Sequence, residues 1–463
     1  MRVYKSAIEA LCVACSAALL SSLLLVATVT GQQSNSRSGN RSKPTVPEVT
    51  TLLQEAAALL QEKQLDQAEP LVRRALILAP QNADAHNLLG VILDQRGKLP
   101  EAEAAYRKAL RLQPRAISPL ANLGVLLAKS ARPEEAIDAF ESVLKIAPEH
   151  QQATINLGLL YVSRGNYKRA AELLGKANER EPNTFDVLFQ LGVSLYYLNR
   201  FDEATTALES AARIAPEAAE PLYYQGLVSF ARGQDQAAGE FWERALELRQ
   251  DYAAPHFMLG EMLRRANRIG PAKEHYERAL ELDASVPLHH IRLGGTYLLL
   301  GNLGKALQIF QDAAKQFPRN AEIHYFAAVA ARGLGNYDVA LAELQKSLAL
   351  QPNSADALAL SGAINFDRAN TVEAEKQLRR ALVFSPQHFN AHYDLGRLLV
   401  KSNRYAEALP FLDVAAKLQP ANPDVHYQIF LALSRLKRKA DANRELEHYR
   451  QLQANEKAGK PVP

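Results

Sequence analysis

One period runs through this sequence of 463 residues, because a similar stretch returns every 34 residues. NLGVLLAKSARPEEAIDAFESVLKIAP begins at Asn122, and NLGLLYVSRGNYKRAAELLGKANEREP begins one period later at Asn156. A period of this length, kept in frame, indicates an array in which each repeat is one supersecondary unit. The period is carried by an alanine that recurs with no gap and no insertion: Ala68, Ala102, Ala136, Ala170, Ala204, Ala238, Ala272, Ala306, Ala340, Ala374, Ala408 and Ala442.

Each unit carries the signals of two helices joined by a turn. Leu120, Leu123 and Leu127 lie at helical spacing, and Ala136 and Phe140 begin a second apolar face. Proline near the end of most units stops the second helix. The turn between the helices is marked by residues that tolerate the left-handed conformation of a helix C-cap: Gly97, Gly165, Asn199, Gly233, Asn267, Gly301, Gly335 and Asn403.

A second column of small residues lies on the first helix of the unit. We expect this glycine column and the alanine column to be small because two helix backbones pack closely there. The glycines are Gly90, Gly124, Gly158, Gly192, Gly226, Gly260, Gly294, Gly362 and Gly396.

These residues together resemble a known family. The pattern is Leu-Gly, then Tyr161 or Tyr297 three residues on, alanine, an aromatic such as Phe140 or Trp242, alanine and proline. It resembles the tetratricopeptide repeat over residues 49–456. The resemblance implies an all-α fold, a right-handed superhelical solenoid of about twelve 34-residue helix-turn-helix repeats whose first helices line a concave groove. The family's tryptophan slot often holds histidine here: His86, His256, His290, His324, His392 and His426.

The expected organisation has four parts. Residues 1–31 are a signal peptide or an N-terminal membrane anchor, 32–48 a flexible linker, 49–456 the repeat array and 457–463 a disordered tail. The twelve repeats are expected at 49–82, 83–116, 117–150, 151–184, 185–218, 219–252, 253–286, 287–320, 321–354, 355–388, 389–422 and 423–456. The repeats 49–82, 321–354 and 423–456 lack the glycine, and the outer two are expected to cap the stack.

The N-terminal stretch predicts location. Arg2 and Lys5 precede an uncharged run over residues 10–30, which is typical of an export signal and also long enough to span a bilayer. We therefore expect a chain exported to the periplasm or extracellular space, or anchored to the membrane by this segment. Cys12 and Cys15 lie inside the run, which disfavours a redox or metal role.

The sequence predicts no catalytic, cofactor or metal site, so we expect neither an enzyme nor a small-molecule substrate. No H-E-x-x-H motif occurs, and histidines one repeat apart are related by stacking and do not converge on one point. Gly294-Gly295 follows no strand, which argues against a phosphate loop. The net charge of +4 argues against an obligate nucleic-acid binder.

A protein or an extended peptide is the expected partner, bound in the groove by a non-catalytic interaction scaffold. Two other classes stay open: a substrate-recognition arm for a catalytic subunit on a separate chain, and a helical-repeat nucleic-acid binder. By resemblance, aromatic and arginine slots of the first helices face the groove, although the rings could instead pack against the adjacent repeat. The candidates are Phe189, Tyr196, Tyr223, Phe230, Phe257, Arg264, Arg292, Tyr325, Arg332, Phe366, Tyr393, Arg397 and Tyr427.

Overall fold

The computed structural model describes residues 46–457, which form 24 α-helices and no strand. The predicted all-α repeat solenoid is thereby confirmed. The first described helix begins at Val46, inside the segment expected to be a linker, and the last one ends at Lys457. The expected signal or anchor at 1–31, the rest of the linker and residues 458–463 lie outside the described part. Among the described helices, none has the length and apolar character needed to cross a membrane.

The chain divides into two compact units, of which the first ends at Gln250 and the second begins at Asp251. In unit 1, the first helices of the repeats are α2 (Val46–Gln61), α4 (Ala83–Gln95), α6 (Ile117–Lys129), α8 (Gln151–Ser163), α10 (Phe185–Tyr197) and α12 (Ala219–Ala231). The second helices are α3 (Leu65–Leu78), α5 (Leu99–Leu112), α7 (Pro133–Ile146), α9 (Tyr167–Arg180), α11 (Phe201–Ile214) and α13 (Asp235–Leu248).

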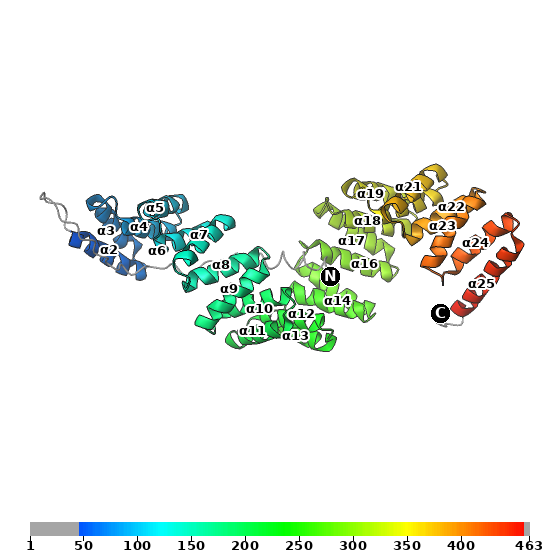
Figure 1. The fold of residues 1–463 in the computed structure, drawn as a ribbon. Coiled ribbons are helices and arrows are strands. Elements are labelled where there is room, and N and C mark those ends of the chain that lie inside the picture. Colours follow the sequence, from blue (N-terminus) through cyan, green and yellow to red (C-terminus); the bar gives the residue numbers. More distant parts are fainter. Residues whose placement is uncertain (1–45, 458–463) are drawn as a thin grey trace. The chain divides into compact units, whose positions relative to one another are not determined.

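Unit 2 repeats the same plan (Figure 1). Its first helices are α14 (Ala253–Arg265), α16 (Pro287–Leu299), α18 (Ala321–Gly333), α20 (Ala355–Asp367), α22 (Phe389–Lys401) and α24 (Pro423–Arg435). Its second helices are α15 (Ile269–Leu282), α17 (Leu303–Gln316), α19 (Tyr337–Leu350), α21 (Thr371–Phe384), α23 (Tyr405–Leu418) and α25 (Lys439–Lys457).

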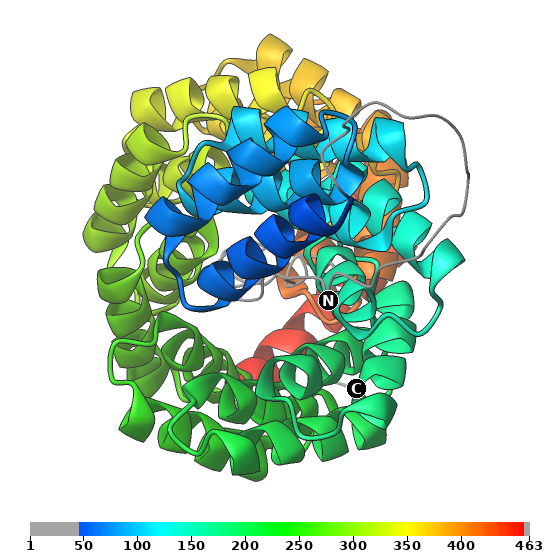
Figure 2. The same cartoon turned by 90° about the vertical axis from the view of Figure 1, so that its left-hand side faces the viewer.

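Helices pack in chain order within each unit. Every helix contacts the next one, and first helices also contact first helices of the following repeat, as α4 does with α6 and α20 with α22. Figure 2 shows these neighbouring helices side by side within each unit. The first helices therefore form one layer and the second helices another, with the core between them.

The two columns of small residues lie in this core. The alanines from Ala68 to Ala408 have no exposed surface, and Ala442 is 3% exposed. The glycines contact a side chain rather than a second backbone, which corrects our expectation. A Cβ built on Gly260 would lie 2.7 Å from Cε1 of Tyr276, sixteen residues further on. Each of the other eight glycines in the column also lies against the side chain of the residue sixteen positions later. The large side chain of the second helix therefore occupies the space that glycine leaves free.

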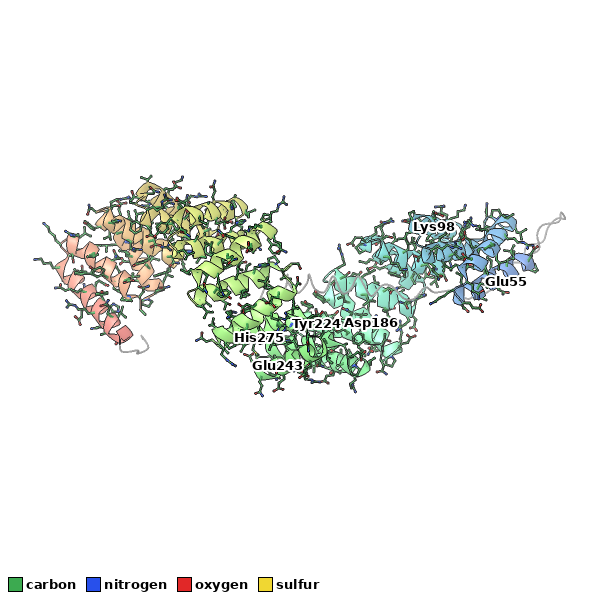
Figure 3. The ribbon with its side chains drawn as sticks, turned by 180° about the vertical axis from the view of Figure 1, so that it is seen from behind. Glu55, Lys98, Asp186, Tyr224, Glu243 and His275 are labelled. Carbon is green, nitrogen blue, oxygen red and sulfur yellow. The ribbon has the colours of Figure 1, made fainter. Side chains whose placement is uncertain are left out.

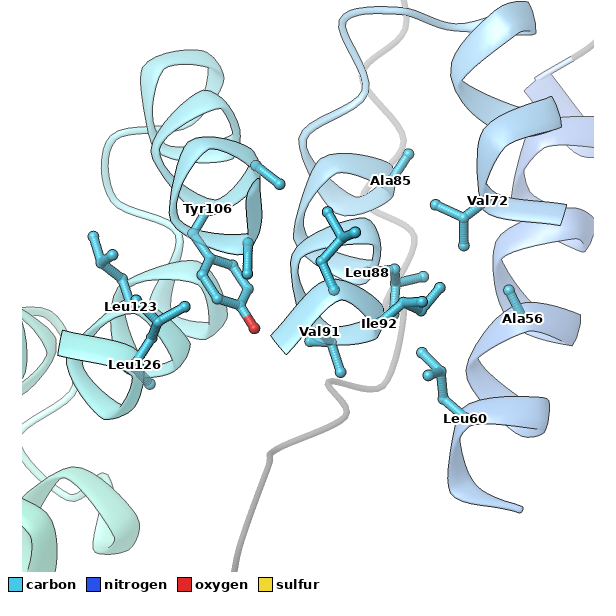
Figure 4. Packing of buried hydrophobic residues seen from close by; sticks show 14 of the residues in the cluster. Ala56, Leu60, Val72, Ala85, Leu88, Val91, Ile92, Tyr106, Leu123 and Leu126 are labelled. Atoms are coloured by element: carbon cyan, nitrogen blue, oxygen red, sulfur yellow. The ribbon is translucent and has the colours of Figure 1, made fainter. Parts of the chain in front are cut away.

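Figure 4 shows this packing in unit 1. The Tyr106 ring lies between the helix that carries Val91 and the helix that carries Leu123 and Leu126, and all four side chains are buried. Tyr106 thus joins one repeat to the next. Its hydroxyl is buried without a hydrogen-bond partner, and burial raises its pKa.

The turns between paired helices confirm the C-cap prediction. All eight glycines and asparagines of the column have positive φ, from 57° at Asn267 to 76° at Gly335. The four repeats without them have the same backbone conformation at Lys63, Ala131, Ala369 and Lys437, with φ between 55° and 62°. The same turn conformation therefore occurs in all twelve repeats, whichever residue occupies the turn position.

Candidate partner-binding surface

The histidines of the tryptophan slot tie each repeat to the one before it. Nε2 of His392 lies 2.9 Å from the carbonyl oxygen of Pro386, and His426 makes the same contact with Pro420 at 3.0 Å. His86, His290 and His324 do likewise with the residue six positions earlier. Five of the six slot histidines thus make hydrogen bonds across repeat boundaries.

His256 is the exception in this column. Its Nδ1 lies 3.2 Å from Nδ1 of His275, which is labelled on α15 in Figure 3. Burial, with smaller effects from the positive charges that His275 and Arg278 can carry, lowers the pKa of His256 to about 4. The two imidazoles therefore share a hydrogen bond between α14 and α15 while His256 is neutral.

Four of the predicted aromatic residues are buried. Phe189, Tyr223, Phe257 and Phe366 have exposed fractions between 4% and 7%, so the packing alternative holds for these rings. Phe189 contacts Tyr224 of the next repeat edge to face, with ring centroids 5.7 Å apart. Such contacts join neighbouring first helices.

The other five rings reach the surface to differing degrees. Tyr196 packs edge to face on Tyr224, burial raises its pKa to about 12, and Phe230 lies beside Trp242. Tyr325 and Tyr393 are half-buried, whereas Tyr427 is 38% exposed. These rings leave a partly accessible aromatic edge on the first-helix layer of each unit.

Two of the four predicted arginines hold a buried carboxylate that the sequence interpretation missed. Glu261 on α14 is 1% exposed. Arg292 Nε donates to it at 2.8 Å, Arg264 Nη2 at 3.2 Å, and the Tyr276 hydroxyl at 2.5 Å. Because a buried carboxylate needs such partners, these arginines stabilise the interior of unit 2. The available sequence signal was that Glu261 places a carboxylate in a slot that is apolar in most other repeats.

The remaining two arginines, Arg332 and Arg397, lie at or beside a cavity of about 630 Å³ on the first helices of unit 2. We call it the Arg397 cavity. Helices α20, α22 and α24 supply most of its lining, and the start of α19 supplies the rest. The lining residues are Tyr337, Phe366, Asp367, Arg397, Val400, Lys401, Gln428 and Leu431.

The floor of the Arg397 cavity combines an aromatic ring with cations. The Arg397 guanidinium lies 5.2 Å from the Phe366 ring centroid and 5.3 Å from that of Tyr393, and Lys401 Nζ lies 5.0 Å from Phe366. Asp394 accepts a hydrogen bond from Arg397 at 3.1 Å. The arginine is thus held in place by both ring faces and a carboxylate.

The cations around the cavity outnumber the carboxylates by one. Arg332 Nη2 donates to Asp367 at 3.2 Å, and burial raises the pKa of Asp394 despite the nearby arginines. Arg332, Arg397 and Lys401 therefore face two carboxylates, one of which is costly to ionise. Lys401 is exposed and has the greatest freedom to meet a partner.

Four of the predicted residues, Arg332, Phe366, Tyr393 and Arg397, lie at or near this cavity, whereas the sequence interpretation did not name several of their neighbours. Asp367 and Lys401 occupy the slot directly after the aromatic one, at the end of each first helix. Reading that slot by the same 34-residue step would have given five charged residues among its twelve positions: Lys129, Arg265, Asp367, Lys401 and Arg435.

The fold and this surface define a helical-repeat protein. Sequence models described as "Tetratricopeptide repeat" match residues 53–117, 189–255, 257–321, 291–355 and 325–388, and a further one matches 365–427. The chain belongs to the tetratricopeptide repeat family. A model described as "Anaphase-promoting complex, cyclosome, subunit 3" matches residues 129–211. No curated protein sequence matches the chain.

Several solved structures are similar to this chain. The APC/C hetero-tetramer Cut9-Hcn1 is 15% identical, with 88% of this chain and 94% of that chain covered and a TM-score of 0.46. YrrB, described as a TPR protein with an unusual peptide-binding site, is 24% identical, with 40% and 95% covered and a TM-score of 0.39. PilF of Pseudomonas aeruginosa is 23% identical, with 46% and 98% covered and a TM-score of 0.41.

Proposed function

We propose that this chain is a non-catalytic protein-interaction scaffold that binds an extended segment of a partner protein along the first helices of unit 2. The observation that carries the proposal is the Arg397 cavity, to which four successive repeats contribute. A surface built from several repeats suits a segment that runs across them. Arginine held against aromatic rings is also the kind of side chain that dominates binding energy at interfaces.

The lining residues indicate the chemistry of the segment. Val400 and Leu431 offer apolar surface beside Phe366, while Lys401 presents an exposed ammonium. A partner segment with an apolar side chain next to a carboxylate satisfies both. The carboxylate would approach Lys401 and Arg397, because with Arg332 the cations at this cavity outnumber the two carboxylates, Asp367 and Asp394.

Site-specific crosslinking tests this proposal. A photoreactive amino acid at Gln428, inside the Arg397 cavity, is expected to capture the partner, and the same amino acid at Lys376 on α21 is the control. With the captured partner purified, Lys401→Glu should weaken binding about tenfold, whereas Lys376→Glu should not. Equal capture at both positions, together with equal affinities, would rule out the cavity as the binding site.

Location is the second part of the proposal. We propose that the chain acts after export or while tethered to a membrane, where it helps to assemble or regulate an envelope complex. The basic start and the uncharged run over residues 10–30 support this, since neither has a use in a repeat array. Cell fractionation with N-terminal sequencing tests it. A full-length chain free in the cytoplasm with an intact N-terminus would refute export.

A further inference from the structure

The last repeat brings three possible metal ligands together at the contact between its two helices. His426 lies on α24, and Glu445 and His448 lie three residues apart on α25, which places both on one face of that helix. One ligand atom from each residue lies within 4.8 Å of those of the other two. His426 is buried, Glu445 is half-buried and His448 is exposed, so the group opens to solvent on one side.

The hydrogen bonds of His426 fix which nitrogen can bind a metal. Its Nε2 lies 3.0 Å from the carbonyl oxygen of Pro420, which can only accept, so Nε2 carries the proton. In the neutral ring, Nδ1 then has a free lone pair. That nitrogen lies 2.7 Å from Oε2 of Glu445. At this distance a proton lies between the two atoms in the metal-free chain, and a bound metal ion would displace that proton.

An earlier repeat of the same chain has an equivalent group of residues, in which a lysine takes the place of the second histidine. Exactly three periods earlier, His324, Glu343 and Lys346 occupy the equivalent positions. His324 Nδ1 lies 2.6 Å from Oε2 of Glu343, and Lys346 Nζ lies 2.7 Å from Oε1. There the lysine ammonium supplies the positive charge. In the last repeat, the place of this ammonium is taken by His448, which offers a lone pair instead.

We propose that His426, Glu445 and His448 bind a divalent transition metal ion, zinc by preference, with water as the fourth ligand. Two imidazoles and one carboxylate are a ligand set typical of zinc with an open position. Tetrahedral zinc requires ligand atoms about 3.4 Å apart. Nδ1 of His426 and Oε2 of Glu445 lie closer than this, and the nitrogen of His448 lies within 4.8 Å of both, so metal binding requires rotations of the Glu445 and His448 side chains. The proposal does not depend on the proposed partner-binding function.

The Pro420 carbonyl completes the arrangement. A metal-bound imidazole generally donates its other N–H to a carbonyl or carboxylate, which orients the ring. His426 has this partner already. The ion would join α24 to α25 by coordinate bonds, and would therefore stabilise the final repeat of the array.

Metal binding can be measured on the full-length chain, purified with a tag that contains no histidine and stripped with a chelator. Zinc is titrated in competition with a chromophoric chelator, and Co²⁺ is used as a spectroscopic probe. His448→Lys restores the arrangement seen at Lys346 and so preserves the fold. Glu445→Gln removes the carboxylate ligand, and Glu447→Gln, an exposed neighbour on α25, is the control.

The wild-type chain is expected to bind one zinc ion tightly and to give the intense visible absorption of four-coordinate Co²⁺. His448→Lys and Glu445→Gln should each weaken zinc binding by about 100-fold or more, and Glu447→Gln should leave it unchanged. Zinc should slow hydrogen exchange in α24 and α25 of the wild type only. Equal zinc affinity in the wild type and His448→Lys, or zinc binding with no protection of these helices, would overturn the proposal.

Discussion

Gly294 and Gly295 stand side by side on α16 but have opposite surroundings, which gives a test at the scale of the residue. A Cβ on Gly294 would lie 2.6 Å from Cε1 of Phe310, whereas a Cβ on Gly295 would have no neighbour within 4 Å. Gly294→Ala should therefore destabilise the fold by about 1–3 kcal/mol through overpacking. Gly295→Ala should stabilise it by about 0.5–1 kcal/mol, because glycine is a poor helix former.

Urea unfolding of the two variants beside the wild type measures both effects. If both variants change the urea midpoint by the same amount and in the same direction, Phe310 moves aside at little cost in free energy. The 34-residue step places Gly294 in the glycine column and leaves Gly295 outside it, so the sequence distinguishes the two residues. The sequence did not reveal that a ring, rather than a backbone, fills the space beside Gly294. The 34-residue step identifies equivalent positions in different repeats, but it does not show which positions within a repeat contact each other.

At the scale of the element, the turn between α6 and α7 strains the backbone at Ala131, and a glycine at this position would relieve the strain. Ala131 has a φ of 55°, where eight other repeats place glycine or asparagine. The left-handed conformation costs a non-glycine residue about 1–2 kcal/mol. Ala131→Gly should thus raise the free energy of unfolding by about 1 kcal/mol, after allowance for the greater chain entropy of glycine.

Gly165→Ala is the reverse change in the next repeat. Gly165 has a φ of 69° and its Cβ would meet nothing within 4 Å, so the substitution tests backbone conformation alone. It should destabilise the fold by about 1 kcal/mol. Thermal melting of both variants checks the pair. If Ala131→Gly lowers the melting temperature, the turn is not strained.

The pairing of α14 with α15 should depend on pH through His256. Its pKa is lowered from the ordinary 6.5 to about 4, so the unfolded chain takes up a proton before the folded one does. The stability that neutral His256 contributes is therefore present above pH 6.5 and is lost as pH falls from 6.5 towards 4. His256→Gln removes this dependence.

The measurement is the difference in urea midpoint between the wild type and His256→Gln at pH 7, 6 and 5. The wild-type midpoint is expected to fall relative to the variant as the pH decreases. A constant difference would mean that His256 titrates alike in both states. Nearby charges on α15, those of His275 and Arg278, act in the same direction in the folded protein.

The candidate surface was predictable only in part. The period predicted that Arg332, Phe366 and Arg397 lie near one another, because Arg332 and Phe366 are one period apart and Arg397 lies three residues before the next position of that slot. It could not separate an exposed ring from a buried one. Tyr223 and Tyr427 share one slot, yet they are 4% and 38% exposed. Their different exposures reflect the residues around each ring, such as Tyr224, which follows Tyr223 on α12 and contacts its ring, and the 34-residue step does not compare such contacts.

At the scale of the whole molecule, damage to one repeat should stay close to that repeat. Ala204 on α11 has no exposed surface, and Ala204→Leu should cost about 1–3 kcal/mol by overpacking. The main contacts of α11 are with α10 and α12. Hydrogen exchange should therefore speed up first at residues 185–218 and in the adjoining repeats, since solenoid stability is a sum of neighbour contacts.

Hydrogen exchange by mass spectrometry resolves this pattern. Uniform acceleration from α2 to α13 would show that unit 1 unfolds as one cooperative body. An unchanged pattern with an unchanged melting curve would contradict the overpacking itself. The fold as a whole followed from the sequence because twelve equivalent alanines constrain every helix pair in the same way. The division of the chain after Gln250 did not, because the loss of the repeat-ending proline at Gln250 recurs at Ala284, where the chain is not divided.

The hydrogen bond from the slot histidine has a consequence for how such a chain can evolve. Its acceptor is a backbone carbonyl, which every residue has. His290 therefore makes with Ala284 the same hydrogen bond that His392 makes with Pro386. The glycine and the large side chain sixteen residues later belong to a single repeat and are inherited together. A duplication or loss of 34 residues therefore joins surfaces that already fit. Descendants of this chain can grow longer or shorter by whole repeats without the compensating substitutions that a globular core would demand.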